Sequence, residues 1–433
     1  MPTHADRHQA AAALPGRRLP TSVQRFLDTE AAGGIVLLVA AVVAFVWANS
    51  PWSAGYQALW HTEVSVGFGR YVLREDLQHW VNDALMAVFF FVVGLEIKQE
   101  LVHGSLRDPR AAAMPAIAAV GGMVVPAAVY LAVTAGGEGA RGWGIPMATD
   151  IAFAVGVVAV LGRGVPAALK LFLLTLAIVD DIGAIIVIGA FYSSGLRPGF
   201  LGLAALVVLA ILAVNRAGVV WTVPYVVLGA ALWLATFVSG VHATIAGVVL
   251  GLLTPTVNFV PATVARGWAA DLADEPTAAE LVTMTRLAQH AVSPAERIAH
   301  ALHPWTSFLV VPVFALANAG VTLRRDAFDA PGAVAVTAGV MLGLVLGKTA
   351  GIAGAAWLGH RLGVARLPEN STWGMVVATA AVAGIGFTVS LFVAELAFDA
   401  GPLQDSARLG VLAASLVAAT VGGTALWWTS RAR

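Results

Sequence analysis

Apolar segments of about 20 residues recur from one end of the chain to the other, separated by shorter polar connections. Each is long enough to cross a hydrocarbon core about 30 Å thick as an α-helix. The pattern predicts an all-α, polytopic membrane protein with twelve spans, at residues 31–49, 81–98, 111–135, 145–162, 169–192, 199–215, 219–237, 240–254, 303–320, 332–358, 371–398 and 405–429. The span at 240–254 is short. If it does not cross, the two chain ends lie on opposite sides of the membrane.

Composition points the same way. The chain is 59% hydrophobic and 12% charged, whereas soluble domains are about 25% charged. Lys plus Arg and Asp plus Glu both total 25, so no basic excess indicates a nucleic-acid partner. The chain contains no cysteine, which excludes disulfides, cysteine-based zinc clusters and a cysteine nucleophile.

The chain divides into a single transmembrane domain, 27–429, and two short tails, 1–26 and 430–433. Residues 1–26 are polar and lack the apolar core of a signal peptide. With the N-terminus inside, cytoplasmic segments collect 17 of the 25 Lys and Arg residues and outer loops 7. The positive-inside rule therefore favours both termini in the cytoplasm.

Two connections between spans are long. Residues 51–80 form an expected outer loop, and "HTEVSVGFGRYVLREDL" (61–77) predicts a β-hairpin with a glycine-containing turn. The open edges of such a hairpin can pair with a second subunit; a solvated loop is the alternative. Residues 255–302 form an expected cytoplasmic loop that divides the spans into eight and four.

A few ionisable residues interrupt the spans. Asp180 and Asp181 stand together in "LFLLTLAIVDDIGAIIVIGAFY", where each should cost roughly 2.5–3.5 kcal/mol on insertion. The others are Asp83, Asp150, His242, Lys348 and Glu395, with Glu96 near the cytoplasmic end of its span. Acids that only staple helices together would come in matched pairs with bases, yet one lysine faces at least four acids. This excess of carboxylate indicates a cation or proton pathway.

The paired aspartates cannot point the same way, because successive residues on a helix are about 100° apart. One can line a cavity while the other pairs across a helix interface. Lys348 is the only intramembrane base that could pair with either.

Two spans look broken. "RGWGIPMATDIAFAVGVVAVLGRG" (141–164) predicts two half-helices flanking Thr149 and Asp150, and "GIGF" (384–387) interrupts a second apolar run. Interrupted helices in corresponding places of two halves indicate a transporter's binding site. Asp150 could offset the electropositive half-helix N-termini, and Lys348 the electronegative C-termini. For "GIGF" alone, a kinked structural helix is the alternative.

Several long motifs resemble the NhaA family of bacterial sodium/proton antiporters. They are "VNDALMAVFFFVVGLEIK", "ATDIAFAVGVVAVLG", "LAIVDDIGAIIVIGAFY", "SGVHATIAGV", "HALHPWTSFLVVPVFALANAG", "LGLVLGK" and "AGIGFTVSLF". The resemblance is collinear over about 27–428. It implies the NhaA-like fold, with twelve helices and an inverted repeat around two broken, crossed helices. It also implies a multi-pass protein of the bacterial inner membrane.

The resemblance assigns roles at the ion site. It makes Asp181 the principal ligand of the transported Na+, and Asp180 its neighbour, which pairs with Lys348 or joins in proton transfer. Asp150 and Thr149 belong to the crossing of extended chains. Asp83 supports the pathway, and Gly384 and Gly386 make the second break.

The same resemblance assigns the response to pH to Glu96, Lys98, His300 and His303. Three positions depart from the family pattern: Gln99 stands where Arg is known, Ala299 where Glu is known, and Glu395 where a small residue is usual. The pH set-point is therefore open. The 61–77 hairpin resembles the one through which family members form homodimers. Membrane lipid is the other expected partner, and no cofactor is implied.

The expected activity is electrogenic export of Na+ or Li+ in exchange for protons, by competition for the buried aspartates. The protein is then a secondary transporter and not an enzyme. The alternatives are a same-fold transporter of K+ or of an organic anion with sodium, and a non-transporting sensor. An intramembrane aspartyl protease does not fit, because its two acids come face to face from separate helices.

Overall fold

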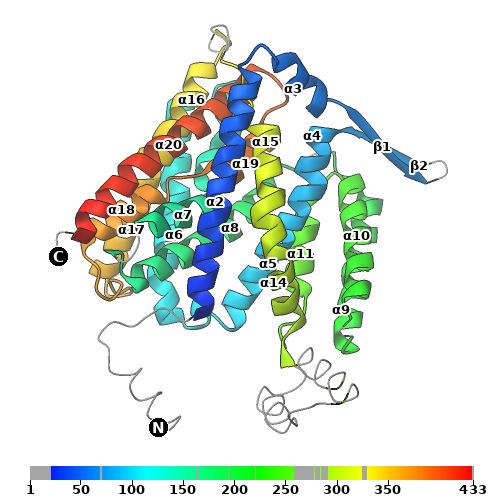
Figure 1. Ribbon diagram of the computed structural model, residues 1–433, viewed down its shortest axis with the longest axis horizontal. Helices are drawn as coiled ribbons and strands as arrows, with labels where there is room; N and C mark the ends of the chain where they lie inside the picture. The colour runs from blue at the N-terminus through cyan, green and yellow to red at the C-terminus, as the bar shows by residue number, and fades with distance from the viewer. Residues whose placement is uncertain are drawn as a thin grey trace.

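The computed structural model describes residues 21–68, 71–161, 164–193, 195–219, 221–257, 277, 283, 291–323 and 329–431. Most of the tail expected at 1–26, much of the loop expected at 255–302 and the last two residues lie outside the described residues. The described part is a bundle of helices with one small β-hairpin at its end (Figure 1).

The first half of the bundle, in chain order, consists of α2 (Thr21–Ala48), α3 (Ser53–Trp60), β1 (Glu63–Phe68), β2 (Tyr71–Asp76), α4 (Leu77–Trp80), η1 (Val81–Leu85), α5 (Met86–Val102), η2 (Ser105–Arg107), α6 (Pro109–Thr134), η3 (Glu138–Met147), α7 (Ile151–Val160), α8 (Ala167–Phe191), α9 (Pro198–Arg216), α10 (Thr222–Ser239) and α11 (Thr244–Leu253). The second half consists of α14 (Pro294–Trp305), η5 (Thr306–Val310), α15 (Val311–Asn318), α16 (Ala333–Leu342), η7 (Gly343–Gly347), α17 (Lys348–Arg361), α18 (Trp373–Val382), α19 (Phe387–Ala397) and α20 (Pro402–Arg431).

Seven helices of the described residues are long and apolar enough to cross a membrane, and the number rises to ten if each of three bent pairs is one span. Two further apolar helices, α10 and α11, are shorter. The chain is therefore a multi-pass membrane protein. The number twelve stays a prediction, because these spans are recognised by length and composition alone.

The hairpin β1–β2 extends from one end of the bundle, in the stretch where the sequence predicts one (Figure 1). Its strands pair antiparallel, from Glu63 opposite Asp76 to Phe68 opposite Tyr71. Val66 and Val72 are more than half exposed on it. We call this end of the bundle, which also carries α3, the hairpin side.

The helix that carries Lys348 is held by a very close backbone contact. A Cβ atom added to Gly121 of α6 would lie 2.3 Å from the carbonyl oxygen of Gly351 of α17, and one added to Gly351 would lie 2.2 Å from that of Gly121. Only glycine lets the two backbones approach so closely, as is common between membrane helices. The contact fixes α17, with Lys348 in its first turn, against the core.

Two segments are interrupted halfway. The axes of η3 and α7 differ by 46°, and those of α18 and α19 by 47°. The interruptions touch each other, since the backbone N–H of Asp150 donates to the carbonyl of Ile385 at 2.7 Å. Non-helical backbone is tolerated at membrane depth where protein surrounds and pairs it. The inverted repeat and the crossing remain predictions.

Candidate functional site

Asp150 joins the two interrupted segments through its side chain. It is the N-cap of α7, where Oδ1 accepts from the N–H of Phe153 at 2.9 Å. Its Oδ2 accepts from the N–H of Thr388 at 3.0 Å and from the hydroxyl of Thr388 at 2.7 Å, in the first turn of α19. One carboxylate thus accepts backbone donors from the N-termini of two half-helices, where negative charge is most stabilised.

Lys348 lies at the C-terminus of η3, the first half of the first interrupted segment. Its ammonium donates to the carbonyl of Met147, the last residue of η3, and lies 2.5 Å from Asp180 Oδ2. Both side chains of this ion pair are fully buried. The positive charge therefore satisfies a carbonyl at a helix C-terminus and neutralises one of the two adjacent aspartates.

Thr149 connects the ion pair to the second break. Its Oγ1 lies 2.6 Å from Asp180 Oδ2 and 2.9 Å from the carbonyl oxygen of Ala383. The hydroxyl has a single proton, which it can donate to one of these acceptors at a time. Asp180, Thr149 and Lys348 form one buried polar group at the point where three segments meet.

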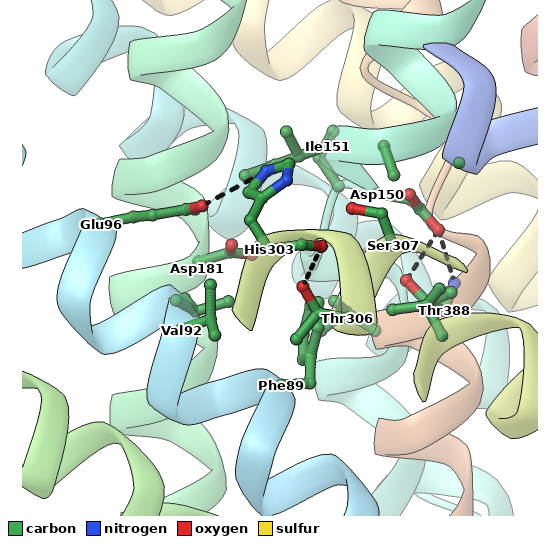
Figure 2. A pocket seen from close by; sticks show the side chains of 16 residues that line it. Phe89, Val92, Glu96, Asp150, Ile151, Asp181, His303, Thr306, Ser307 and Thr388 are labelled. Carbon is green, nitrogen blue, oxygen red and sulfur yellow. Dashed lines mark hydrogen bonds and ion pairs between the residues drawn. The ribbon is translucent and has the colours of Figure 1, made fainter. Parts of the chain in front are cut away.

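Asp181 faces a different environment. It lines a cavity of about 50 Å3, roughly the space of a few water molecules. The polar residues around this cavity are Glu96, Thr149, Asp150, Asp181, His303, Thr306, Ser307 and Thr388. In Figure 2 the carboxylate of Asp181 lies between Glu96 on one side and the Asp150–Thr388 contact on the other.

The oxygens of the two aspartates are incompletely paired. Among the described residues, Asp181 Oδ1 and Asp180 Oδ1 are buried without a hydrogen-bond partner. Such atoms are uncommon and require an explanation. Carboxylate, hydroxyl and carbonyl oxygens are the ligands that hard cations prefer. The arrangement can therefore hold a small cation, or a proton in its place.

Glu96 and His303 stand together at one end of the cavity, with Glu96 Oε1 3.9 Å from His303 Nε2 (Figure 2). Glu96 lies in the second half of α5, which leads away from the hairpin. The side chains of Glu96 and His303 are partly exposed, at 24% and 15%, so the cavity reaches accessible residues at this end. We call this end, which lies on the side opposite the hairpin, the mouth of the cavity.

Three of the residues assigned from the sequence lie elsewhere. Asp83 is in η1, on the hairpin side of α5, and does not line the cavity. His300 is exposed on α14, and Lys98 of α5 is half-buried outside the cavity. Gly384 and Gly386 are at the break between α18 and α19, where a Cβ on Gly384 would lie 2.4 Å from the carbonyl oxygen of Leu344.

Thr388 and Ser307 were not identified from the sequence. The position of Thr388, just after "GIGF", could have identified it, because a hydroxyl at the start of a half-helix is available to polar groups nearby. Ser307 belongs to η5 on a distant segment and lines the cavity. No local pattern marks it.

The sequence matches the family described as Na+/H+ antiporter 1 over residues 24–426. It is 46% identical to Na(+)/H(+) antiporter NhaA 2 of Sorangium cellulosum, over 94% of this chain and 91% of that protein. It is also 46% identical to the Na(+)/H(+) antiporters NhaA of Rhodopirellula baltica and of an Acidovorax species. These matches cover 95% and 99% of this chain and 97% of each relative.

Proposed function

This chain belongs to the Na+/H+ antiporter 1 family, and we propose that it exports Na+, and also Li+, in exchange for protons. The proposed location is the bacterial cytoplasmic membrane, with both termini in the cytoplasm and the hairpin outside. Transport proceeds by alternating access, in which the ion site opens to one side at a time.

The observation that carries the mechanism is the position of Asp181. Its carboxylate lines the cavity and has one oxygen without a hydrogen-bond partner among the described residues. When ionised, it binds the cation together with nearby oxygens. When protonated, it loses the charge that holds the ion. Cation and proton therefore compete for one group, and this competition couples their movements.

Asp180 and Lys348 supply the second proton in this proposal. Their ion pair is buried and touches the site without lining the cavity. Two protons can be carried for one Na+, either on the two carboxylates or on Asp181 and Lys348. Exchange would then move net charge and be driven partly by the membrane potential.

Glu96 and His303 are proposed to regulate access by pH, because they line the mouth of the cavity and can change charge there. Lys98 and His300 are close in sequence to Glu96 and His303 but do not line the cavity, so we expect them to act less directly. A homodimer formed through β1 and β2 is supported by the exposed valines on the hairpin.

Proton flux in everted vesicles or proteoliposomes tests the proposal. NaCl, LiCl or KCl is added between about pH 6 and 9, and a pH probe reports exchange. Wild type should respond to Na+ and Li+, and Asp181→Asn should not respond. Asp329→Asn, which changes an exposed aspartate in the same way, should behave as wild type.

Exchange by Asp181→Asn at the wild-type rate would refute the assigned mechanism. A wild-type response to K+ alone, or no response to any cation, would favour another substrate or a sensor.

A further inference from the structure

A second ionic cluster, largely buried, lies away from the ion site. Its centre is the pair of Glu395 on α19 and Arg408 on α20, whose side chains are 13% and 11% exposed. Gln404 donates to Glu395 Oε2 at 3.1 Å, and Asp405 Oδ1 lies 3.7 Å from Arg408 Nη1. We call Glu395, Gln404, Asp405 and Arg408 the α19–α20 cluster.

The α19–α20 cluster lies on the hairpin side. Asn49, just after α2, donates to the carbonyl of Val321 at 2.8 Å on that side. Figure 1 shows α16 beginning at the same end of the bundle, which carries α3. The chain then crosses through α16 and α17, and returns through α18 and α19. Glu395, near the end of α19, is therefore at the end of the bundle opposite the cavity mouth (Figure 1).

The same short helix is held at both ends. Thr388, in the first turn of α19, binds Asp150 at the ion site. Glu395 follows seven residues later, about 10 Å along the helix axis. A movement of α19 relative to α20 that opens the ion site toward the hairpin side would therefore also move Glu395 relative to Arg408.

Not every polar atom of the α19–α20 cluster has a hydrogen-bond partner. Arg408 Nε is buried without a hydrogen-bond partner among the described residues. Buried ion pairs stabilise a fold less than apolar packing of similar volume, whereas a pair that fixes one of two arrangements has a use. Neither Glu395 nor Arg408 lines the cavity, so neither serves as a cation ligand in this state.

We propose that the Glu395–Arg408 pair is an ionic latch that holds α19 against α20 while the ion site is open on the side opposite the hairpin, and that it separates when the site opens to the hairpin side. Both residues are positioning residues. This inference rests on the proposed function, because it concerns the two states between which an antiporter alternates.

The test measures the half-saturating Na+ concentration from each face, in proteoliposomes of defined orientation. In Glu395→Gln the state open to the hairpin side becomes more populated. Half-saturating Na+ applied on that side should fall by about tenfold, and that on the opposite side should rise, because apparent affinity follows the population of the competent state. Arg408→Gln breaks the same pair and should give the same two shifts.

Two further variants make the test specific. Glu138→Gln removes an exposed acid at the start of η3 and should leave both values unchanged. The exchange Glu395→Arg with Arg408→Glu restores an opposite-charge pair and should return both values toward wild type. It also serves if a single variant folds poorly, which size-exclusion chromatography would reveal.

Unchanged values in both single variants, or values that move in the same direction on both faces, would overturn the latch. General damage to the fold predicts such parallel changes. Absence of exchange in wild type would instead overturn the proposed function, so the two failures are distinguishable.

Discussion

The ammonium of Lys348 lies 2.5 Å from the carboxylate of Asp180, and neither side chain is exposed. Asp181, the next residue, lines the cavity and makes no such pair among the described residues. Two neighbouring carboxylates of the same helix therefore have different surroundings: one is paired with a lysine, and the other lines the cavity.

Separating the Lys348–Asp180 pair should destabilise the protein strongly. Lys348→Met or Asp180→Asn alone leaves one buried charge without its partner, which costs about 3–5 kcal/mol. The double variant leaves no buried charge and should be destabilised by less than the sum of the two single changes. Thermal unfolding in detergent measures all four proteins. Additive losses would contradict the pairing.

Sodium should stabilise the wild type through Asp181. A ligand that binds only the folded state at 100 times its dissociation constant adds about 2.7 kcal/mol. We expect the melting temperature of the wild type to rise with NaCl relative to choline chloride, and that of Asp181→Asn to stay constant. Asp329→Asn is the matched control. An equal rise in Asp181→Asn would place the bound ion elsewhere.

Thr388 should contribute through its hydroxyl. Thr388→Val removes a hydrogen bond to the Asp150 carboxylate, and bonds to charged groups contribute about 1.5–3 kcal/mol. We expect lower thermal stability and slower exchange, and near-wild-type behaviour in Thr388→Ser, which keeps the hydroxyl. If the valine and serine variants behave alike, the hydroxyl has no such role.

Gly384 should not tolerate a side chain. A Cβ there would lie 2.4 Å from the carbonyl oxygen of Leu344, which is backbone and cannot turn away. Gly384→Ala should lose about 1–3 kcal/mol of stability and most of the exchange. Gly202→Ala, on α9 with nothing within 4 Å of the added Cβ, should gain up to about 1 kcal/mol. Equal effects of both changes would argue against the close approach.

Asp76 should make the base of the hairpin sensitive to acid. Burial raises the pKa of Asp76, but hydrogen bonds from the backbone N–H of His79 and from the rings of His61 and His79 outweigh it and lower the pKa below its ordinary value. The stabilisation is therefore complete above about pH 4 and is lost as the pH falls through the folded-state pKa. The amide exchange rate of β1 and β2, divided by the intrinsic rate of an unprotected amide at the same pH, should rise there in wild type. Asp76→Asn should exchange faster at every pH and lack this step.

The sequence by itself determined the class of protein and the segments that matter. Apolarity and segment length are local properties, so the spans could be recognised without knowing their neighbours. Rare intramembrane charges identified Asp180, Asp181 and Lys348 for a similar reason, since a charge inside a long apolar run can be recognised from the sequence without knowing its partner. The interruptions near Asp150 and Gly384 were visible in the same way.

Only the tertiary structure decided which residues contact one another. Thr149 and Asp180 are 31 residues apart in the chain, Asp180 and Lys348 are 168 apart, and Asp150 and Thr388 are 238 apart. Such contacts depend on how helices cross and rotate, which no local pattern encodes. The separation of Asp83 from the cavity, the exposure of His300 and the pairing of Glu395 with Arg408 followed from the same packing.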